Sequence, residues 1–307
     1  MGQKVFTLSE TSPTPKLRVK NMDAKKTSIF LFLSLLFIVA GYIHYHVPRK
    51  SIFLVPDVYI YGELNDTVLI RVYWIGTDSK EYNLIKNSNL SIVGLDDFAT
   101  LKKFGIKETL RYHNPAIKEL TFGIYLTLNK IGIHENNVTL IIENKKENYR
   151  KELNIGRWIF EISPKHRHPL KITDMIDLEI GFFGKNVSPE CMFAVKNVGT
   201  QPLTVLEVQY NLSDLQIDRI TYVNATNLGE IENDTKEIRF PAEGLKLKPN
   251  ESKVIIIHFK EGDFRHPRKP AVIRFKILYK AKGRVYAIPL VYTYEIVPIP
   301  TSKQLKE

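Results

Sequence analysis

Short apolar segments with alternating polar positions dominate the chain after residue 50 and predict strands. Leu120–Leu128 alternates apolar and polar residues with period two, and Thr67–Ile75 is a longer run rich in β-branched residues. Such alternation puts every second side chain on one face of a strand, whereas helices repeat with a period near 3.6 residues. Gly, Pro and Asn separate the segments at intervals of about 10 to 15 residues, the spacing typical of a β-sandwich.

The complete pattern predicts strands at Ile52–Val55, Val58–Tyr61, Thr67–Ile75, Leu120–Leu128, Val138–Ile142, Tyr149–Ile155, Trp158–Ile162, Ile172–Phe183, Glu190–Asn197, Thr204–Tyr210, Arg219–Tyr222, Glu237–Phe240, Lys253–Phe259, Val272–Lys280 and Arg284–Val297. Within Lys253–Phe259 both alternating sets are largely apolar, which predicts a strand covered on both faces.

One segment departs from the strand pattern. Apolar residues at 98, 101 and 104 follow the acidic pair Asp96-Asp97, which predicts a short helix over 96–104 that ends at Gly105. Pro164–Pro169 carries two prolines and four polar residues and is the best candidate for a domain boundary. The sequence therefore predicts an all-β fold of two consecutive β-sandwich domains, at 51–163 and 170–298, followed by a tail at 299–307.

An uncharged, mostly apolar block at 27–47 precedes these strands. It has about the 20 residues that a helix needs to cross a bilayer, so it predicts a transmembrane signal-anchor. Six basic residues precede the block against two acidic ones, and a basic excess stays on the cytoplasmic side. We therefore expect a cytoplasmic, disordered tail at 1–26 and extracytoplasmic domains. A cleaved signal peptide ending at Ala40 is the alternative, but Ile38 is too bulky for its cleavage site.

Composition narrows the class of protein. Cys191 is the only cysteine, so no intrachain disulfide framework holds the domains together. We expect this thiol to be buried and inert. The net charge is +11, yet no basic motif interleaved with aromatic residues indicates nucleic-acid binding. A solvated, solubilising surface is the simplest interpretation of the charge.

Two turns in the second domain resemble a known family. They are Phe193–Leu203, which contains Val195-Lys-Asn-Val-Gly199, and Leu247–Lys253, which contains Leu247-Lys-Pro-Asn-Glu-Ser252. Over about 170–297 they resemble the immunoglobulin-like repeats of bacterial and archaeal surface proteins, of the cell-adhesion-related domain type. The resemblance implies an immunoglobulin-like sandwich and no particular activity. We also expect Asn197 and Gly199 to adopt positive φ in their turn.

Glycosylation sequons are the strongest compositional signal. All eight follow the apolar block, whereas about two are expected by chance: Asn65, Asn89, Asn137, Asn186, Asn211, Asn224, Asn233 and Asn250. They predict a glycoprotein whose outer part is extracellular. The alternative is that Asn, Ser and Thr gather in the turns of a β protein without being modified.

Other candidate chemistry has a simpler interpretation. His166 and His168 could share a metal ion on a strand, but the flanking prolines favour a solvated linker. His44 and His46 are expected at the membrane interface. Asp174, Asp177 and Glu179 lack the spacing of a calcium loop, and Arg265–Lys269 is interpreted as a solvated loop. No catalytic motif, metal site or cofactor site is predicted.

Together these patterns predict a non-enzymatic, single-pass membrane protein of the cell surface. It would act in binding, assembly or cell adhesion through an envelope protein or glycan partner and would not bind nucleic acid. Two alternatives remain open from the sequence: a carbohydrate-binding surface protein, which needs exposed aromatic residues on one face, and an envelope hydrolase, which needs two converging acidic groups in a cleft.

Overall fold

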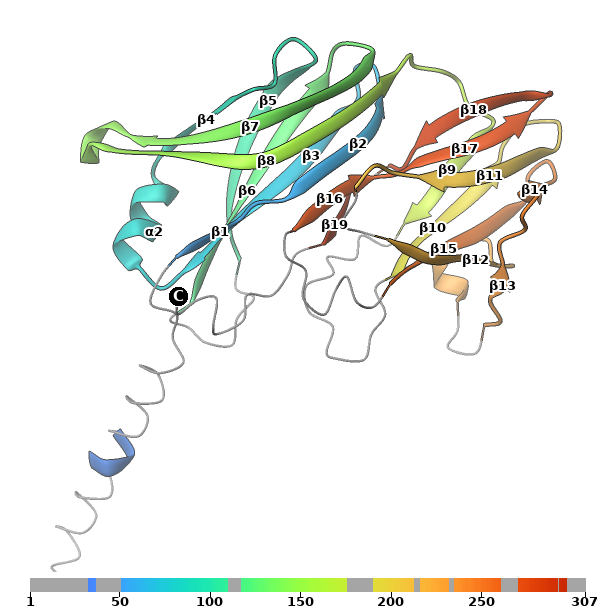
Figure 1. Cartoon of the computed structure of the whole chain (residues 1–307). Helices are drawn as coiled ribbons and strands as arrows, with labels where there is room; N and C mark the ends of the chain where they lie inside the picture. Colours follow the sequence, from blue (N-terminus) through green and yellow to red (C-terminus); the bar gives the residue numbers. More distant parts are fainter. Residues whose placement is uncertain are drawn as a thin grey trace, which may run out of the picture. The chain divides into compact units, whose positions relative to one another are not determined.

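A computed structural model (Figure 1) describes residues 33–36, 51–109, 117–175, 190–212, 216–231, 235–260, 270–291 and 293–296. The chain forms two compact units, Met1–His46 and Val47–Glu307. In the first unit, residues 33–36 are helical. Among the described residues, no helix combines the length and apolar character needed to cross a membrane. Apart from 33–36, the predicted span at 27–47 lies outside the described residues.

The second unit is all-β with one short helix. Its elements are β1 (Ile52–Leu54), β2 (Asp57–Glu63), β3 (Thr67–Gly76), α2 (Ser79–Lys86), β4 (Asn89–Val93), β5 (Ala99–Thr109), β6 (Lys118–Leu128), β7 (Gly132–Asn144), η1 (Lys145–Glu147), β8 (Tyr149–Ser163), β9 (Leu170–Met175), β10 (Glu190–Asn197), β11 (Leu203–Gln209), β12 (Ile217–Val223), η2 (Leu228–Glu230), β13 (Ile238–Arg239), β14 (Leu245–Leu247), β15 (Ser252–Phe259), β16 (Ala271–Arg274), β17 (Lys276–Ala281), β18 (Arg284–Pro289) and β19 (Tyr294–Ile296).

These strands form four sheets. Sheet A has the order β1-β3-β6-β5, sheet B has β19-β16-β2-β8-β7-β4, sheet C has β13-β12-β15-β10-β9, and sheet D has β14-β11-β17-β18. Alternate residues of sheets A and B, such as Trp74, Phe122 and Trp158, share one apolar core. Residues of sheets C and D, such as Phe193, Ile257 and Tyr279, share a second core. The sheets therefore pack face to face in two pairs, as in β-sandwiches.

Strand β2 is buried on both faces and belongs to both cores. Val58 and Ile60 lie in the core of sheets A and B, whereas Tyr59 and Tyr61 lie in the core of sheets C and D. Both of its neighbours, β8 and β16, run parallel to it. Parallel strands occur where both faces are covered and read as continuous apolar runs, which matches the sequence Asp57-Val-Tyr-Ile-Tyr61.

Two predicted strands are each divided between two sheets. Val272–Lys280 was expected to be one strand, but β16 joins sheet B beside β2 and β17 joins sheet D, with Phe275 between them (Figure 1). Likewise, β18 of sheet D ends at Pro289, and β19 pairs with β16 in sheet B. The apolar alternation continues through both changes, so the local pattern carries no sign that the pairing partner changes. Sheet B thus takes strands from both sides of the predicted boundary at Pro164–Pro169.

The predicted helix at 96–104 is wrong. Residues 96–98 form a turn, in which Asp96 has a φ of 47°, and β5 begins at Ala99. The register between β5 and β6 shifts between Leu101 and Lys103. The extra residue of this β-bulge puts Leu101 and Phe104 on the same face of the sheet. A strand with a bulge has therefore reproduced the three-residue spacing that usually indicates a helix.

Helix α2, the one α-helix among the described residues of this unit, was not predicted from the sequence. Asp78 is its N-cap, and its carboxylate accepts hydrogen bonds from the backbone N–H groups of Lys80 and Glu81. Tyr82 and Ile85 are its buried residues. Eight residues with two apolar contacts give too short a periodic signal to distinguish a helix from a polar loop.

The two turns that carry the family resemblance lie against one another. The Asn197 side chain is fully buried, donates to the carbonyls of Gln201 and Leu247, and accepts from Gly199 N–H. Asn250 N–H donates to the Asn197 carbonyl. Positive φ belongs to Asn250 rather than to Asn197 or Gly199, so that expectation is wrong. Gly199 is needed for close approach, because a Cβ there would lie 2.9 Å from Pro169 Cβ.

The shared sheet leads to a folding prediction. Residues 51–163 alone lack β16 and β19, which leaves one edge of β2 unpaired and the side chains of Tyr59, Tyr61 and Ile159 without their second core. We expect this fragment to show no cooperative thermal transition by circular dichroism and tryptophan fluorescence, whereas residues 51–297 unfold in a single transition. A cooperative transition of the short fragment would contradict this view of sheet B.

Candidate functional site

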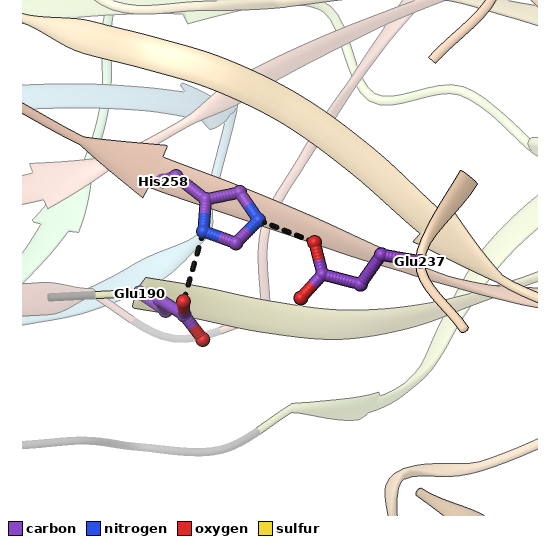
Figure 2. Close-up of side chains that lie close together, drawn as sticks. All are labelled: Glu190, Glu237 and His258. Atoms are coloured by element: carbon purple, nitrogen blue, oxygen red, sulfur yellow. Dashed lines mark hydrogen bonds and ion pairs between the residues drawn. The ribbon is translucent and has the colours of Figure 1, made fainter. Parts of the chain in front are cut away.

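Among the described residues, a histidine between two glutamates is the most concentrated group of chemically versatile side chains. His258 lies in β15, directly opposite Glu190 of β10 and Arg219 of β12. Its Nδ1 is 2.8 Å from Glu190 Oε1, and its Nε2 is 2.9 Å from Glu237 Oε2. Figure 2 shows the two carboxylates on opposite sides of the imidazole ring. The hydroxyl of Thr221, on β12, lies 2.9 Å from Nε2 and donates to Glu237 over 2.8 Å.

The cluster lies on the outer face of sheet C, which also carries a small second group of buried apolar residues. Val254 and Ile256 on β15 pack there with Ala194, Val223 and Ala225, whereas Ile255 and Ile257 face the core with sheet D. The prediction that this strand is covered on both faces is therefore confirmed. His258 continues the outer row and is only 1% exposed, so it needs hydrogen-bond partners for both ring nitrogens.

The geometry favours a histidine bridge between the two carboxylates over a metal centre. Each carboxylate approaches a different ring nitrogen, and one ion cannot bind both nitrogens of a single imidazole. A guanidinium nitrogen of Arg219 also lies 3.3 Å from Nδ1, and its positive charge would oppose a cation there. Through its two nitrogens the ring instead contacts both carboxylates and links β10, β15 and the segment before β13.

The same atoms also resemble a carboxylate–histidine–hydroxyl relay, but the proton positions do not suit one. A nucleophilic hydroxyl must donate its hydrogen to the histidine. Thr221 instead donates to Glu237, and both Thr221 and His258 are buried. The arrangement can therefore hold strands together, and its geometry gives no activated nucleophile.

His168, predicted to lie in a solvated linker, is buried instead. Its Nε2 is 2.7 Å from Glu63 Oε1 and its Nδ1 is 2.9 Å from the Tyr279 hydroxyl. The side chains of His168 and Glu63 are 7% and 9% exposed. His166, by contrast, is exposed and contributes its backbone N–H to Glu63. The solvated-linker interpretation is therefore wrong for the side chain of His168.

A buried ion pair lies beside this histidine. Arg274 of β16 contacts Asp66 Oδ2 at 2.9 Å and also donates from Nε to the Leu290 carbonyl. Burial lowers the pKa of the Arg274 guanidinium, and the Asp66 carboxylate acts in the opposite direction. Burial, together with the charges of Tyr286 and Glu63, raises the pKa of the Tyr279 hydroxyl. Tyr279 therefore stays protonated and available for its hydrogen bond with His168.

The sequons lie on the surface wherever they are described. Six of them are exposed: Asn65, Asn89, Asn137, Asn211, Asn224 and Asn250. Asn186 and Asn233 lie outside the described residues. Asn65 and Asn250 have φ values of 70° and 63°, so the left-handed backbone of their turns is a sufficient reason for asparagine there. Asn65 and Asn250 are thus accessible enough to be glycosylated, and each also provides the left-handed backbone conformation that its turn needs.

The remaining predicted positions have structural roles or fall outside the described residues. Asp174 accepts from the backbone N–H groups of Met175 and Leu228, which ties β9 to η2. Cys191 is fully buried among apolar residues, as expected, and burial raises the pKa of its thiol. His44, His46, Asp177, Glu179 and Arg265–Lys269 lie outside the described residues.

The His258 cluster was not predicted from the sequence, because its members lie far apart along the chain. The one local signal was a histidine inside an otherwise apolar strand, since such a residue needs polar partners when both faces are covered.

The histidine bridge predicts a specific loss of stability. Replacing His258 by leucine removes the polar partner that Glu190 and Glu237 share, so we expect the free energy of unfolding to fall by about 2 kcal/mol. Adding Glu190→Gln and Glu237→Gln to that variant should restore part of the loss. Lys145→Leu, at an exposed site, serves as the control. An unchanged denaturant midpoint in His258→Leu would contradict the bridge.

The buried thiol predicts resistance to alkylation. Because burial raises the pKa of Cys191, the thiol stays protonated as the pH rises, and thiolate is the reactive form. We expect iodoacetamide to leave the native protein unmodified at about pH 9 and to modify it fully in denaturant, as measured by intact mass. Labelling of the native protein that increases from about pH 7 to about pH 9 would show that the thiol is accessible.

No protein-family model and no curated protein matches the chain. Among solved structures, a protein of unknown function from Porphyromonas gingivalis W83 is 12% identical over 80% of this chain and 99% of that chain, with a TM-score of 0.23. The C-terminal domain of the Streptococcus pyogenes antigen I/II-family protein AspA is 8% identical, covering 82% of this chain and 99% of that chain, with a TM-score of 0.23. The YadV chaperone is 9% identical over 79% of this chain and 100% of that chain, with a TM-score of 0.18. Similarity this low supports no conclusion about fold or function, and the family resemblance of 170–297 stays a prediction.

Proposed function

We propose that this protein is a single-pass, membrane-anchored module of a cell envelope. Its two outer β-sandwich domains, the second of them immunoglobulin-like, bind or assemble with other envelope components and perform no catalysis. The observation that carries the proposal is the placement of the sequons. All eight follow the apolar block at 27–47, and each of the six described ones is exposed on the surface.

The apolar block supports the anchor and its direction. Its length suits one crossing of the bilayer, and the six basic residues before it favour a cytoplasmic N-terminus. This orientation puts every sequon on the outer side, where glycosylation takes place. Cysteine usage is compatible with this location, since the two packed cores supply the stability that small secreted domains obtain from disulfides.

The polar clusters support a non-enzymatic role. The groups around His258 and His168 are satisfied by one another within the protein. Their hydrogen bonds join strands of different sheets or segments, which is a structural use of polar side chains. Neither cluster leaves an acid and a base free to act on a bound substrate.

The two alternatives from the sequence have less support. A carbohydrate-binding face needs exposed aromatic rings, and every Phe, Tyr and Trp whose side chain the structure describes is buried or half-buried. A hydrolase needs two converging acidic groups. In the described part, the carboxylates of Glu190 and Glu237 come together at His258, but each contacts a different nitrogen of the ring, which lies between them.

The anchor and the sequons can be tested together in membranes of the native host. Protease added to intact cells should remove an epitope tag at the C-terminus and spare one at the N-terminus. Deglycosylation should increase gel mobility, and Asn65→Gln and Asn250→Gln should each remove one step of the shift. Asn87→Gln, exposed but outside any sequon, is the control. A protected C-terminal tag would refute the orientation, and unchanged mobility would refute glycosylation.

A further inference from the structure

Among the described strands, β5 leaves one long edge of sheet A without a partner strand. It has 11 residues and pairs with β6 on one side, and no described strand pairs with its other side. The other strands at the ends of sheets have only two to six residues. Proteins usually keep such edges short, because unpaired N–H and C=O groups form a template for another strand.

Positive charge dominates the side chains of this edge. Lys102, Lys103 and Lys107 are exposed, and residues 99–107 contain no acidic residue. The Lys103 ammonium lies 4.5 Å from the centre of the Tyr125 ring, on the outer face of sheet A. The first carboxylate along the strand, Glu108, forms an ion pair with Lys86 of α2.

The inner face of the same edge is apolar and incompletely covered. Leu101, Phe104 and Ile106 pack against the core of sheets A and B and remain half-buried. A strand added beside β5 would cover these three side chains, and alternate residues of that strand would meet the lysines on the outer face. None of the eight sequons lies in β5 or β6, so attached glycans would not originate on this edge.

We propose that β5 binds an extended, acidic segment of a partner protein, which pairs with the backbone of residues 103–108 as an additional strand of sheet A. The bulge at Lys102 ends the regular edge on one side. Charge complementarity selects an acidic partner, because like charges across paired strands are destabilising. For the same reason a second copy of this chain is disfavoured, since pairing β5 with β5 would bring six lysines together.

This inference rests on the proposed function and names the surface that the binding module uses. The test is photo-crosslinking of the full chain in native host membranes. A benzophenone amino acid replaces Lys107 at the edge, and in separate proteins it replaces Lys145 in η1 or Arg284 in β18 as matched exposed basic positions. The crosslinked segment of the partner is then identified by mass spectrometry.

We expect an adduct at position 107 to an acidic, extended segment of another protein. Lys102→Glu and Lys103→Glu together should reduce this adduct about tenfold, which corresponds to about 1.4 kcal/mol, and should leave thermal unfolding unchanged. The matched control, Lys145→Glu with Lys146→Glu, should leave the adduct at 107 intact.

Several outcomes would overturn the inference. They are an adduct at 107 that survives the charge reversal, an adduct to a second copy of this chain, and equal crosslinking at 107, 145 and 284. Adducts at 145 or 284 without one at 107 would refute the β5 edge and leave the binding module standing. The absence of adducts at all three positions would count against both proposals.

Discussion

Burial of β2 on both faces is the constraint on which the rest of the outer unit depends. Val58 and Ile60 fill one core while Tyr59 and Tyr61 fill the other, so one strand takes part in both. A strand covered on both faces cannot change register by one residue without exchanging two complete sets of contacts. Its neighbours are equally constrained, because β8 and β16 run parallel to it and lie on either side.

Polar contacts reinforce this shared strand at its end. Glu63, the last residue of β2, binds His168 from the connection between β8 and β9, and Asp66 binds Arg274 from β16. These groups are buried, so removing one partner would leave an unpaired charge or donor at a high cost in free energy. Buried polar networks of this kind also specify one arrangement of strands among those that apolar packing alone would allow.

The sequence was sufficient for most strands and insufficient for their partners. Alternation located segments such as Leu120–Leu128 and Lys253–Phe259, because it reports the local environment of each residue. It could not show that the chain leaves sheet B at Phe275, since both sides of that residue are strands. The bulge at Lys102 produced a false helix, because its extra residue gave a strand the three-residue apolar spacing of a helix. The candidate site around His258 depends on carboxylates 68 and 21 residues away along the chain, a relation that is spatial and has no local signature.

The late arrival of β16 has a consequence during synthesis. Residues 163 and 271 are separated by 108 positions, which a ribosome adds in about 5–20 s at usual elongation rates. During that interval sheet B of the nascent chain is incomplete, and the rings of Tyr59 and Tyr61 are not yet covered by the second core. Such intermediates invite aggregation or wrong strand pairing, so the protein's yield in a cell would depend on whatever shields the growing chain until its last strands emerge.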